Sequence, residues 1–328
     1  MRATVTALFN IDPGALCRDV YFRDDFVALH NTPHGIDGIR REGFVHVAGW
    51  RPIPGSALQD LWTPHGYGGP MATDETALRN GIAQWRTRQE KAGRVAEFIR
   101  FHLCFDPISF ADLFDHVAIN RPTVMVDLSQ AQHHRHRNYS QSTRRFLRKA
   151  ERELSVRQLS ADDAGMFFNL HEAMLTRQGA DPRHRLSMPY VAALLAMPWC
   201  VAWAAELKGR AVAASCFLIT DSPVAHYHLG GGDQAGLDHS AQYLLFEAAF
   251  AHAAAAGCAW MHLGGGRTTA PDDHLLAFKR RFSPIEARFH VGGLIYDRAA
   301  YERLGGARGG LFLGYREPET PPPESKRQ

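Results

Sequence analysis

Two neighbouring stretches decide the fold: Trp260-Met261-His262-Leu263-Gly264-Gly265-Gly266 and, a few residues later, Leu275-Leu276-Ala277-Phe278-Lys279-Arg280-Arg281-Phe282. The first is an apolar run that ends in three glycines, which indicates a buried strand leading into a tight turn. The second spaces Phe278 and Phe282 four residues apart, which places both rings on one side of a helix. The Ala-rich segment 241–256 before the strand also has helical composition. This succession of helix, strand, turn and helix indicates a layered α/β fold.

The alternation continues on both sides of these stretches. Downstream of the chain's middle, strands are expected at 123–128, 200–206, 211–220 and 225–229, and helices at 139–154, 161–178 and 189–197. Upstream, β-prone runs at 20–22 and 44–47 precede a helix at 75–92 and a strand at 95–103. We therefore predict a mixed α/β protein with a first domain at 1–121, a second at 122–316 and a disordered Pro-rich tail at 317–328.

Length and charge narrow the class of protein. The 328 residues suffice for two domains, and 37 Lys and Arg against 34 Asp and Glu leave a net charge of only +3. An anionic partner must therefore be met by a local patch. The five cysteines are scattered, the N-terminus lacks the features of a signal peptide, and the most apolar window is too short to span a bilayer. We expect a reduced, cytoplasmic protein with no membrane span.

The strongest local charge lies between His133 and Arg157, where eight Lys or Arg residues face two acidic residues. On a helix, the cations form a ridge opposite the apolar side chains. The ridge comprises Arg144, Arg145, Arg148, Lys149 and Arg152, opposite Leu147, Ala150 and Leu154. Such a ridge suits the phosphates of a nucleotide diphosphate or of an RNA backbone, and it equally suits a solvated amphipathic helix.

Two further patterns carry little specific chemistry. His133, His134 and His136 alternate with arginines and have no carboxylate at helical spacing, so no metal is assigned. Glycine runs at 66–69, 230–232 and 264–266 follow expected strands, but none has the spacing of a phosphate-binding loop. No Gly-x-Ser-x-Gly elbow is found, and no cysteine has a recognised nucleophile setting. Direct transfer without a covalent enzyme intermediate is therefore favoured over nucleophilic catalysis.

Lys279 is the residue with the sharpest chemical hypothesis. It lies about 100° around the helix from Phe278, at the edge of the buried face, where an ammonium can border a cleft. A cation at that place could stabilise the oxyanion of a tetrahedral acyl-transfer intermediate. The alternative is a surface lysine beside two arginines, and the residues alone favour that alternative.

Several runs together resemble the Fem-type (FemABX) branch of the acetyltransferase (GNAT) superfamily. The runs are Tyr21 to Phe26, Thr63 to Pro70, Phe98 to His102, Val126 to Leu128 before Arg148 to Arg152, and Leu263 to Gly266 before Phe278 to Phe282. The resemblance implies two tandem GNAT-like domains, each a mixed β-sheet flanked by helices. It also implies that Phe278 and Lys279 lie by the acyl-transfer centre, with Lys279 stabilising the tetrahedral intermediate.

The same resemblance implies further site residues and co-substrates. Arg177 of the second domain and Tyr67, Asp74, Gly68 and Gly69 of the first are the expected substrate-binding positions, and the basic ridge is the expected donor or phosphate site. The implied reaction is amide formation, in which an aminoacyl group passes from aminoacyl-tRNA to an amine of a peptidoglycan precursor or related small molecule. No tightly bound cofactor is implied, tRNA is a possible partner, and neither a DNA partner nor a membrane span is expected.

Two other functions stay open from the sequence. The first is an acyl-CoA-dependent GNAT N-acetyltransferase that acts on a sugar or glycan amine. Leu237, in the run Gln234 to Asp238, stands where CoA-binding GNAT domains place the first glycine of their pyrophosphate loop, which counts against this reading. The second is a non-catalytic binder of RNA or of an anionic glycan that uses the basic ridge.

Overall fold

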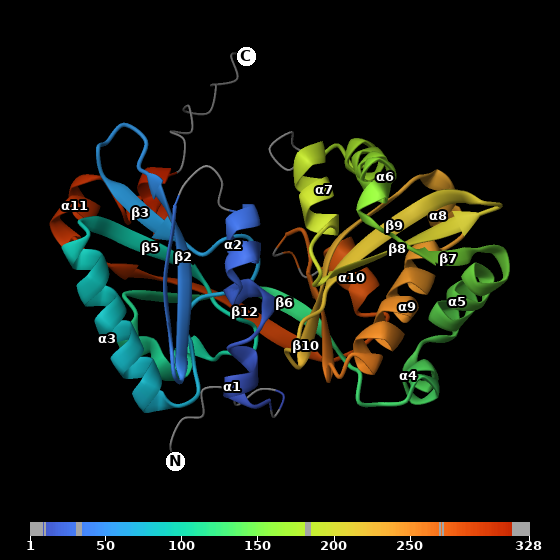
Figure 1. The fold of residues 1–328 in the computed structure, drawn as a ribbon, viewed down its shortest axis with the longest axis horizontal. Helices are drawn as coiled ribbons and strands as arrows, with labels where there is room; N and C mark the ends of the chain where they lie inside the picture. The colour runs from blue at the N-terminus through green and yellow to red at the C-terminus, as the bar shows by residue number, and fades with distance from the viewer. Residues whose placement is uncertain are drawn as a thin grey trace, which may run out of the picture. The chain divides into compact units, whose positions relative to one another are not determined.

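The computed structural model describes residues 9, 11–30, 35–180, 185–268, 270 and 272–316, which form two compact units. Of these described residues, unit 1 comprises those within 1–17, 30–120 and 289–316, and unit 2 comprises those within 18–29 and 121–288. The chain changes unit inside two strands, β6 (His116–Asp127) and β12 (Glu286–Ile295). Each unit is a mixed β-sheet with helices packed on it, which confirms the predicted fold class (Figure 1).

Unit 1 is a mostly antiparallel sheet with the order β1-β2-β3-β5-β12, in which β4 pairs with β2 and β3 runs parallel to β5. The predicted helix 75–92 is α3, which begins at the N-cap Asp74. The elements are α1 (Pro13–Leu16), β1 (Ile36–Arg41), β2 (Phe44–Pro52), β3 (Gln59–Trp62), β4 (Met71–Ala72), α3 (Glu75–Lys91), β5 (Arg94–Arg100), η2 (Pro107–Leu113), α11 (Arg298–Arg303), η5 (Arg308–Gly310) and η6 (Gly314–Arg316).

A buried carboxylate lies in the core of unit 1. Glu97 of β5 has no exposed surface and accepts hydrogen bonds from Trp85 Nε1 at 2.7 Å and Tyr296 Oη at 2.5 Å. The ring of His46 completes the group, with Nε2 at 2.8 Å from the carboxylate. Burial opposes ionisation of Glu97, but His46 and the three hydrogen bonds outweigh it and lower the pKa of the carboxyl below its ordinary value.

Unit 2 has the strand order β6-β11-β10-β9-β8-β7. The strands β7 to β10 are antiparallel, β10 runs parallel to β11, and β11 runs antiparallel to β6. The elements are η1 (Val20–Phe22), α2 (Asp24–His30), α4 (Gln132–Asn138), α5 (Gln141–Glu153), β7 (Ser155–Gln158), η3 (Ala161–Asp163), α6 (Ala164–Arg177), α7 (Met188–Leu195), β8 (Cys200–Leu207), β9 (Arg210–Leu218), β10 (Val224–Gly232), α8 (Gln234–Asp238), α9 (Ala241–Ala255), β11 (Trp260–Gly265) and α10 (His274–Lys279).

Helices cover both faces of the unit 2 sheet (Figure 1). In β8, Trp203 and Ala205 point into a core that also contains Phe246 and Phe250 of α9 and Leu147 of α5. The intervening residues of β8 are buried outside this core, on the side where α6 and α7 pack. The strand is thus apolar on both faces, which explains its continuous run of apolar residues.

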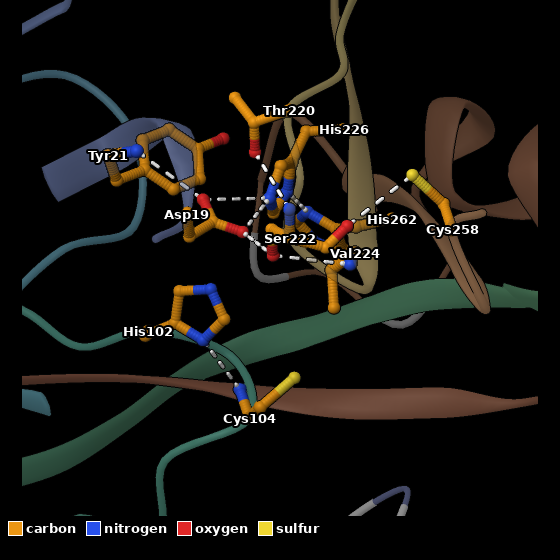
Figure 2. A network of polar contacts seen from close by, with 10 residues as sticks. All are labelled: Asp19, Tyr21, His102, Cys104, Thr220, Ser222, Val224, His226, Cys258 and His262. Carbon is orange, nitrogen blue, oxygen red and sulfur yellow. Dashed lines mark hydrogen bonds and ion pairs between the residues drawn. The ribbon is translucent and has the colours of Figure 1, made fainter. Parts of the chain in front are cut away.

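A short N-terminal segment is tied to unit 2 by a buried polar network (Figure 2). Asp19 accepts a hydrogen bond from Ser222 Oγ at 2.9 Å and lies 3.0 Å from Nε2 of His226 in β10. His226 Nδ1 lies 3.4 Å from Nδ1 of His262 in β11. All four side chains are at most 2% exposed, so these contacts provide partners for polar atoms that have lost their water.

Three expectations differ from the structure or lie outside it. Residues 20–22 form the helix η1 and no strand, because Asp19 caps them by accepting from Tyr21 N and because all three side chains are buried. The two units also differ from the contiguous division into 1–121 and 122–316, since 18–29 belong to unit 2 and 289–316 to unit 1. The predicted tail at 317–328 lies outside the described residues.

Candidate functional site

The site begins where strands β10 and β11 part. The two strands pair in parallel only up to His226 and His262, although both continue beyond these residues. At this point each strand changes register with its other neighbour, between Tyr227 and Leu229 in β10 and between His262 and Gly264 in β11. Such bulges bend a strand, so the sheet opens between β10 and β11.

The glycines that follow in β10 are required by close packing. A Cβ on Gly231 would lie 2.5 Å from the backbone of His171 in α6, and a Cβ on Gly230 would lie 2.5 Å from Tyr227 Oη. Both distances are shorter than any real contact of a Cβ atom. The Gly-rich run therefore lets helix α6 and the hydroxyl of Tyr227 lie close to the backbone of β10.

A cavity of about 390 Å³ lies within unit 2 at this opening. Its volume falls in the range of small-molecule binding pockets. Elements β9, β10, α5, α6, α8, α9 and α10 all contribute to its lining, which is mostly apolar and aromatic. The lining residues are Phe146, Met174, Arg177, Gln178, Ala213, Tyr227, Gly230, Gly231, Gly232, Asp233, Gly236, Leu237, Ser240, Gln242, Tyr243, Phe246, Leu275, Phe278, Lys279 and Arg281.

Lys279 places a cation in the wall of this cavity. The residue is only 5% exposed, and Nζ donates a hydrogen bond to Gly265 O at 2.7 Å. Nζ also lies 5.7 Å from the ring centre of Tyr227. Among the residues that the structure describes, none places a carboxylate oxygen within 4.0 Å of Nζ. The ammonium thus keeps N–H groups that can donate to a ligand.

Asp273 fixes the backbone that holds Lys279. Its carboxylate accepts from the backbone N–H groups of Leu275 and Leu276, and so caps α10. It also accepts from the N–H groups of Arg267 and Thr268 and from Thr268 Oγ1, each at 2.9 or 3.0 Å. One side chain therefore joins the end of the glycine turn to the helix that carries the lysine.

Burial controls the charge of these groups. Burial lowers the pKa of Lys279 to about 7, with Asp273 opposing that decrease and Arg121 adding to it. Burial also opposes ionisation of Asp273, but its hydrogen bonds outweigh this and lower its pKa to about 2. Asp273 is therefore a fixed anion near Lys279, and Lys279 exchanges its proton near neutral pH.

Two arginines and one carboxylate complete the polar part of the lining. Arg177 donates to Gly232 O at 3.0 Å, and Arg281 donates to Tyr243 Oη at 2.6 Å. Both arginines are exposed, and neither forms an ion pair with a carboxylate among the described residues. The carboxylate is Asp233, which pairs with Arg210 and accepts from Gly236 N at 2.9 Å.

The structure brings three of the predicted site residues together. Lys279, Phe278 and Arg177 all line the cavity of unit 2. The expectation that Phe278 and Phe282 share one helix was wrong, because α10 ends at Lys279 and Phe282 follows its C-cap. Their rings nevertheless contact each other, with centres 5.4 Å apart.

The other predicted substrate-binding residues belong to unit 1. Asp74 caps α3 by accepting from Ala77 N at 2.8 Å, and it borders an open groove beside that helix. Tyr67 packs edge-on against Phe289. Gly69 has a φ of +77°, and a Cβ there would lie 2.9 Å from Ile99, while Gly68 bridges to Phe101. These contacts give each residue a structural role, and substrate binding by them stays a prediction.

The basic ridge of α5 is formed, but two of its cations bind backbone. Arg144 donates to Tyr139 O at 2.6 Å, and Lys149 donates to Asp238 O at 2.7 Å. Arg145, Arg148 and Arg152 are exposed. None of the five lines the cavity described above, although Phe146 of the same helix does. Donor or phosphate binding by the ridge therefore stays a prediction separate from the cavity.

The histidines before this ridge form contacts within unit 2. The rings of His133 and His134 contact each other, and His136 Nε2 lies 3.0 Å from Glu247 Oε2. Tyr139 Oη donates to Glu247 at 2.6 Å. Glu247 is buried in α9, so this group fastens α4 to that helix.

Sequence reasoning missed most of the cavity wall. Tyr227 comes from β10, whereas Tyr243 and Phe246 come from α9, and no local pattern marks the strand residue as a neighbour of the helix residues. Asp273 carried a usable signal, because an Asp directly before an apolar helical run is a typical N-cap. Its contact with the glycine turn depends on the fold and could not be read from that signal.

Comparisons with known proteins agree with this geometry. Residues 134–280 match the acetyltransferase (GNAT) domain. The crystal structure of FemX superposes with a TM-score of 0.72 at 10% identity, over 89% of this chain and 97% of that chain. The DUF2156 domain of a lysylphosphatidylglycerol synthetase from Agrobacterium fabrum gives 0.59 at 14% identity, over 92% and 97%. L-PGS from Bacillus licheniformis gives 0.55 at 12%, over 78% and 82%. No curated protein sequence matches this chain significantly.

The segment 134–280, which matches the acetyltransferase (GNAT) domain, contains Lys279 and all of the cavity lining except Arg281. The chain as a whole has the Fem-type fold, as its likeness to FemX over nearly the whole length of both chains shows. The resemblance noted in the sequence is thus confirmed. No helix of the described residues is both long and apolar enough to cross a bilayer.

Proposed function

We propose that this protein forms amides by transferring an aminoacyl group from an aminoacyl-tRNA to an amine of a small molecule, such as a peptidoglycan precursor. The observation that carries the proposal is the buried ammonium of Lys279 in the wall of a cavity lined by Phe278. A cation in a site of low polarity stabilises developing negative charge much more strongly than one in water.

The chemical step needs no enzyme nucleophile. The neutral acceptor amine attacks the ester carbonyl, an N–C bond forms, and the carbonyl oxygen becomes an oxyanion that Lys279 stabilises. The C–O bond to the ribose then breaks, and the proton lost by the amine goes to the leaving hydroxyl. The protein contributes orientation and charge stabilisation.

The polar rim supports a donor with phosphate groups. Arg177 and Arg281 line the cavity, are exposed, and bind neutral oxygen atoms of the protein. Exposed guanidinium groups that are not paired with a carboxylate are suited to binding phosphate, because phosphate forms charge-assisted hydrogen bonds with them. The ribose-phosphate end of a tRNA and the phosphates of CoA both satisfy this requirement.

The turn between β10 and α8 favours tRNA over CoA. The carboxylate of Asp233 already accepts the N–H of Gly236, the group that a bound pyrophosphate would need. A carboxylate at that place also repels phosphate. The acyl-CoA alternative is nevertheless retained for a sugar or glycan amine, because residues 134–280 match a domain described as an acetyltransferase.

A donor screen tests the proposal. The enzyme is incubated with a mixture of primary amines and either a pool of charged tRNA or acetyl-CoA, and amide products are detected by mass spectrometry. We expect RNase-sensitive product from charged tRNA. Product from acetyl-CoA alone would establish the alternative, and product from neither donor would contradict both.

Lys279→Met tests the assigned cation. We expect its kcat to fall about 100- to 1000-fold, the usual effect of removing an oxyanion-stabilising group. Arg280→Ala is the matched control, because the neighbouring Arg280 forms a surface ion pair with Glu286. Full turnover in Lys279→Met would remove the lysine from the mechanism.

A further inference from the structure

We infer that the cavity of unit 2 selects donors whose transferred group has a large apolar side chain, of the size of leucine or phenylalanine. This inference rests on the proposed function, because Lys279 is taken to mark the position of the reacting carbonyl. It adds the substrate class that neither the domain match nor the likeness of fold supplies.

The wall of the cavity is aromatic on several sides. Six large apolar side chains from α5, β10, α9 and α10 line it: Phe146, Tyr227, Tyr243, Phe246, Leu275 and Phe278. A polar or charged acyl side chain that packs against these six side chains would lose its hydrogen bonds with water, and their apolar surfaces offer none to replace them. The wall therefore disfavours polar aminoacyl groups.

The wall is preformed by its own contacts. Tyr243 packs edge-on against Phe278 with ring centres 5.3 Å apart, and Tyr227 packs edge-on against Phe246 at 5.0 Å. Phe146 also contacts Tyr243, at 5.4 Å. Aromatic rings held in this way cannot collapse easily to fill an empty space. A glycyl or alanyl group would leave the part of the cavity beside these rings unfilled and would lose the dispersion contacts that a larger side chain makes with them.

The charges of the lining support the same conclusion. Its cations are Lys279, Arg177 and Arg281, whereas Asp233 is the one carboxylate among the described lining residues. Asp233 is already paired with Arg210 and hydrogen-bonded to Gly236 N. A basic acyl side chain would thus meet three cations with no carboxylate available to it. Repulsion by these cations excludes lysyl and arginyl donors. The poor filling of the cavity excludes donors with a small side chain.

Binding of non-reactive donor analogues tests the inference without any acceptor. One tRNA body carries glycine, alanine, leucine, phenylalanine or lysine through a 3′-amide that cannot transfer, and Kd is measured by fluorescence anisotropy. We expect the leucine and phenylalanine analogues to bind about 10- to 100-fold more tightly than the other three. Equal affinities, or tighter binding of glycine or alanine, would overturn the inference.

A variant that fills the cavity separates selectivity from general damage. Leu275 is half-buried in the cavity wall, and its side chain makes none of the hydrogen bonds that hold Asp273 or Lys279. We expect Leu275→Trp to weaken the phenylalanine analogue at least 10-fold and to change the alanine analogue less than threefold. Equal loss for both analogues would show damage without selectivity and would contradict the inference.

The inference and the proposed donor can fail separately. If no tRNA analogue binds, the proposed donor fails, and the same comparison is made with non-reactive acetyl-CoA and phenylacetyl-CoA analogues. Tighter binding of the phenylacetyl group would support the inference on the alternative donor. Equal affinities there, or no binding of either CoA analogue, would overturn it.

Discussion

Each unit of this protein buries a charged side chain, and the two charges are treated differently. Glu97 in unit 1 receives hydrogen bonds from Trp85 and Tyr296 and pairs with His46. Among the described residues, Lys279 in unit 2 donates a hydrogen bond to Gly265 O alone, and it borders a cavity. The carboxylate has its hydrogen-bonding capacity filled by the fold, whereas the ammonium keeps part of its capacity for something that enters the cavity.

The pKa values express the same difference. The partners of Glu97 outweigh its burial, and its pKa is lowered, so its charged form is the stable one. Burial of Lys279 is opposed mainly by Asp273, and its pKa falls to about 7. A buried charge that stabilises the fold is thus distinguished from one suited to chemistry by how fully its partners compensate the loss of water.

The largest change in the free energy of unfolding is expected from removing the charge of Glu97, which its partners compensate fully. Glu97→Gln removes the anion that faces His46, and we expect it to lower the free energy of unfolding by about 3 kcal/mol. The difference in the free energy of unfolding between the wild type and Glu97→Gln should become smaller as the pH falls below the ordinary carboxyl range. The wild type loses there the stability that the charge of Glu97 contributes. Chemical denaturation at pH 7 and at pH 3 measures both. Glu75→Gln, at an exposed ion pair with Arg79, is the control and should change stability very little.

Removing the charge of Lys279, which its partners compensate only in part, is expected to raise the free energy of unfolding. The unfolded chain holds the lysine proton up to about 10.5, whereas the folded chain releases it near 7. Between these values the unfolded state binds more protons, so the wild type gains stability as the pH rises. Lys279→Met should therefore be more stable than the wild type at pH 6, and this advantage should be smaller at pH 9. A variant less stable than the wild type at pH 6 would show that the ammonium is fully compensated.

The layered fold could be predicted because its signals are local. Apolar runs such as 200–206 and 211–220 are strands, and the Lys208-Gly209 turn between them has positive φ at both residues. The run 20–22 misled the prediction because its β-prone residues are buried by a neighbouring sheet and capped by Asp19. At these residues the tertiary contacts outweighed the intrinsic preference for a β-strand.

The candidate site was predictable only in part, for a related reason. Lys279 and Phe278 are adjacent in sequence and could be named together from one motif. Their surroundings depend on the separation of β10 from β11. Two bulges, one in each strand, produce this separation. Nothing in a linear pattern states which aromatic side chains will meet across such an opening. The assembly of Tyr227 with Phe246 therefore required the structure.

A smaller effect is expected at the anion that faces Lys279. Asp273→Asn keeps a side chain that caps helices well but removes the negative charge that raises the pKa of Lys279. The alkaline limb of the pH profile of kcat should then move to lower pH, by up to about one unit, because the lysine loses its proton earlier. Asp297→Asn makes the same change at the cap of α11 and should leave the limb in place. An unmoved limb in Asp273→Asn would contradict the proposed coupling.

The smallest effect separates a structural role from a binding role in unit 1. Asp74 caps α3, so Asp74→Ala should lower the free energy of unfolding by about 1 kcal/mol, and Asp74→Ser should recover most of that loss. Because serine lacks the carboxylate, Asp74→Ser retains the cap but cannot form a charged contact with substrate. The predicted substrate-binding role therefore requires a higher acceptor KM in Asp74→Ser at unchanged stability. An unchanged KM would show that Asp74 only caps α3. Asp74 of unit 1 would then have a structural role, in contrast to the reactive Lys279 of unit 2.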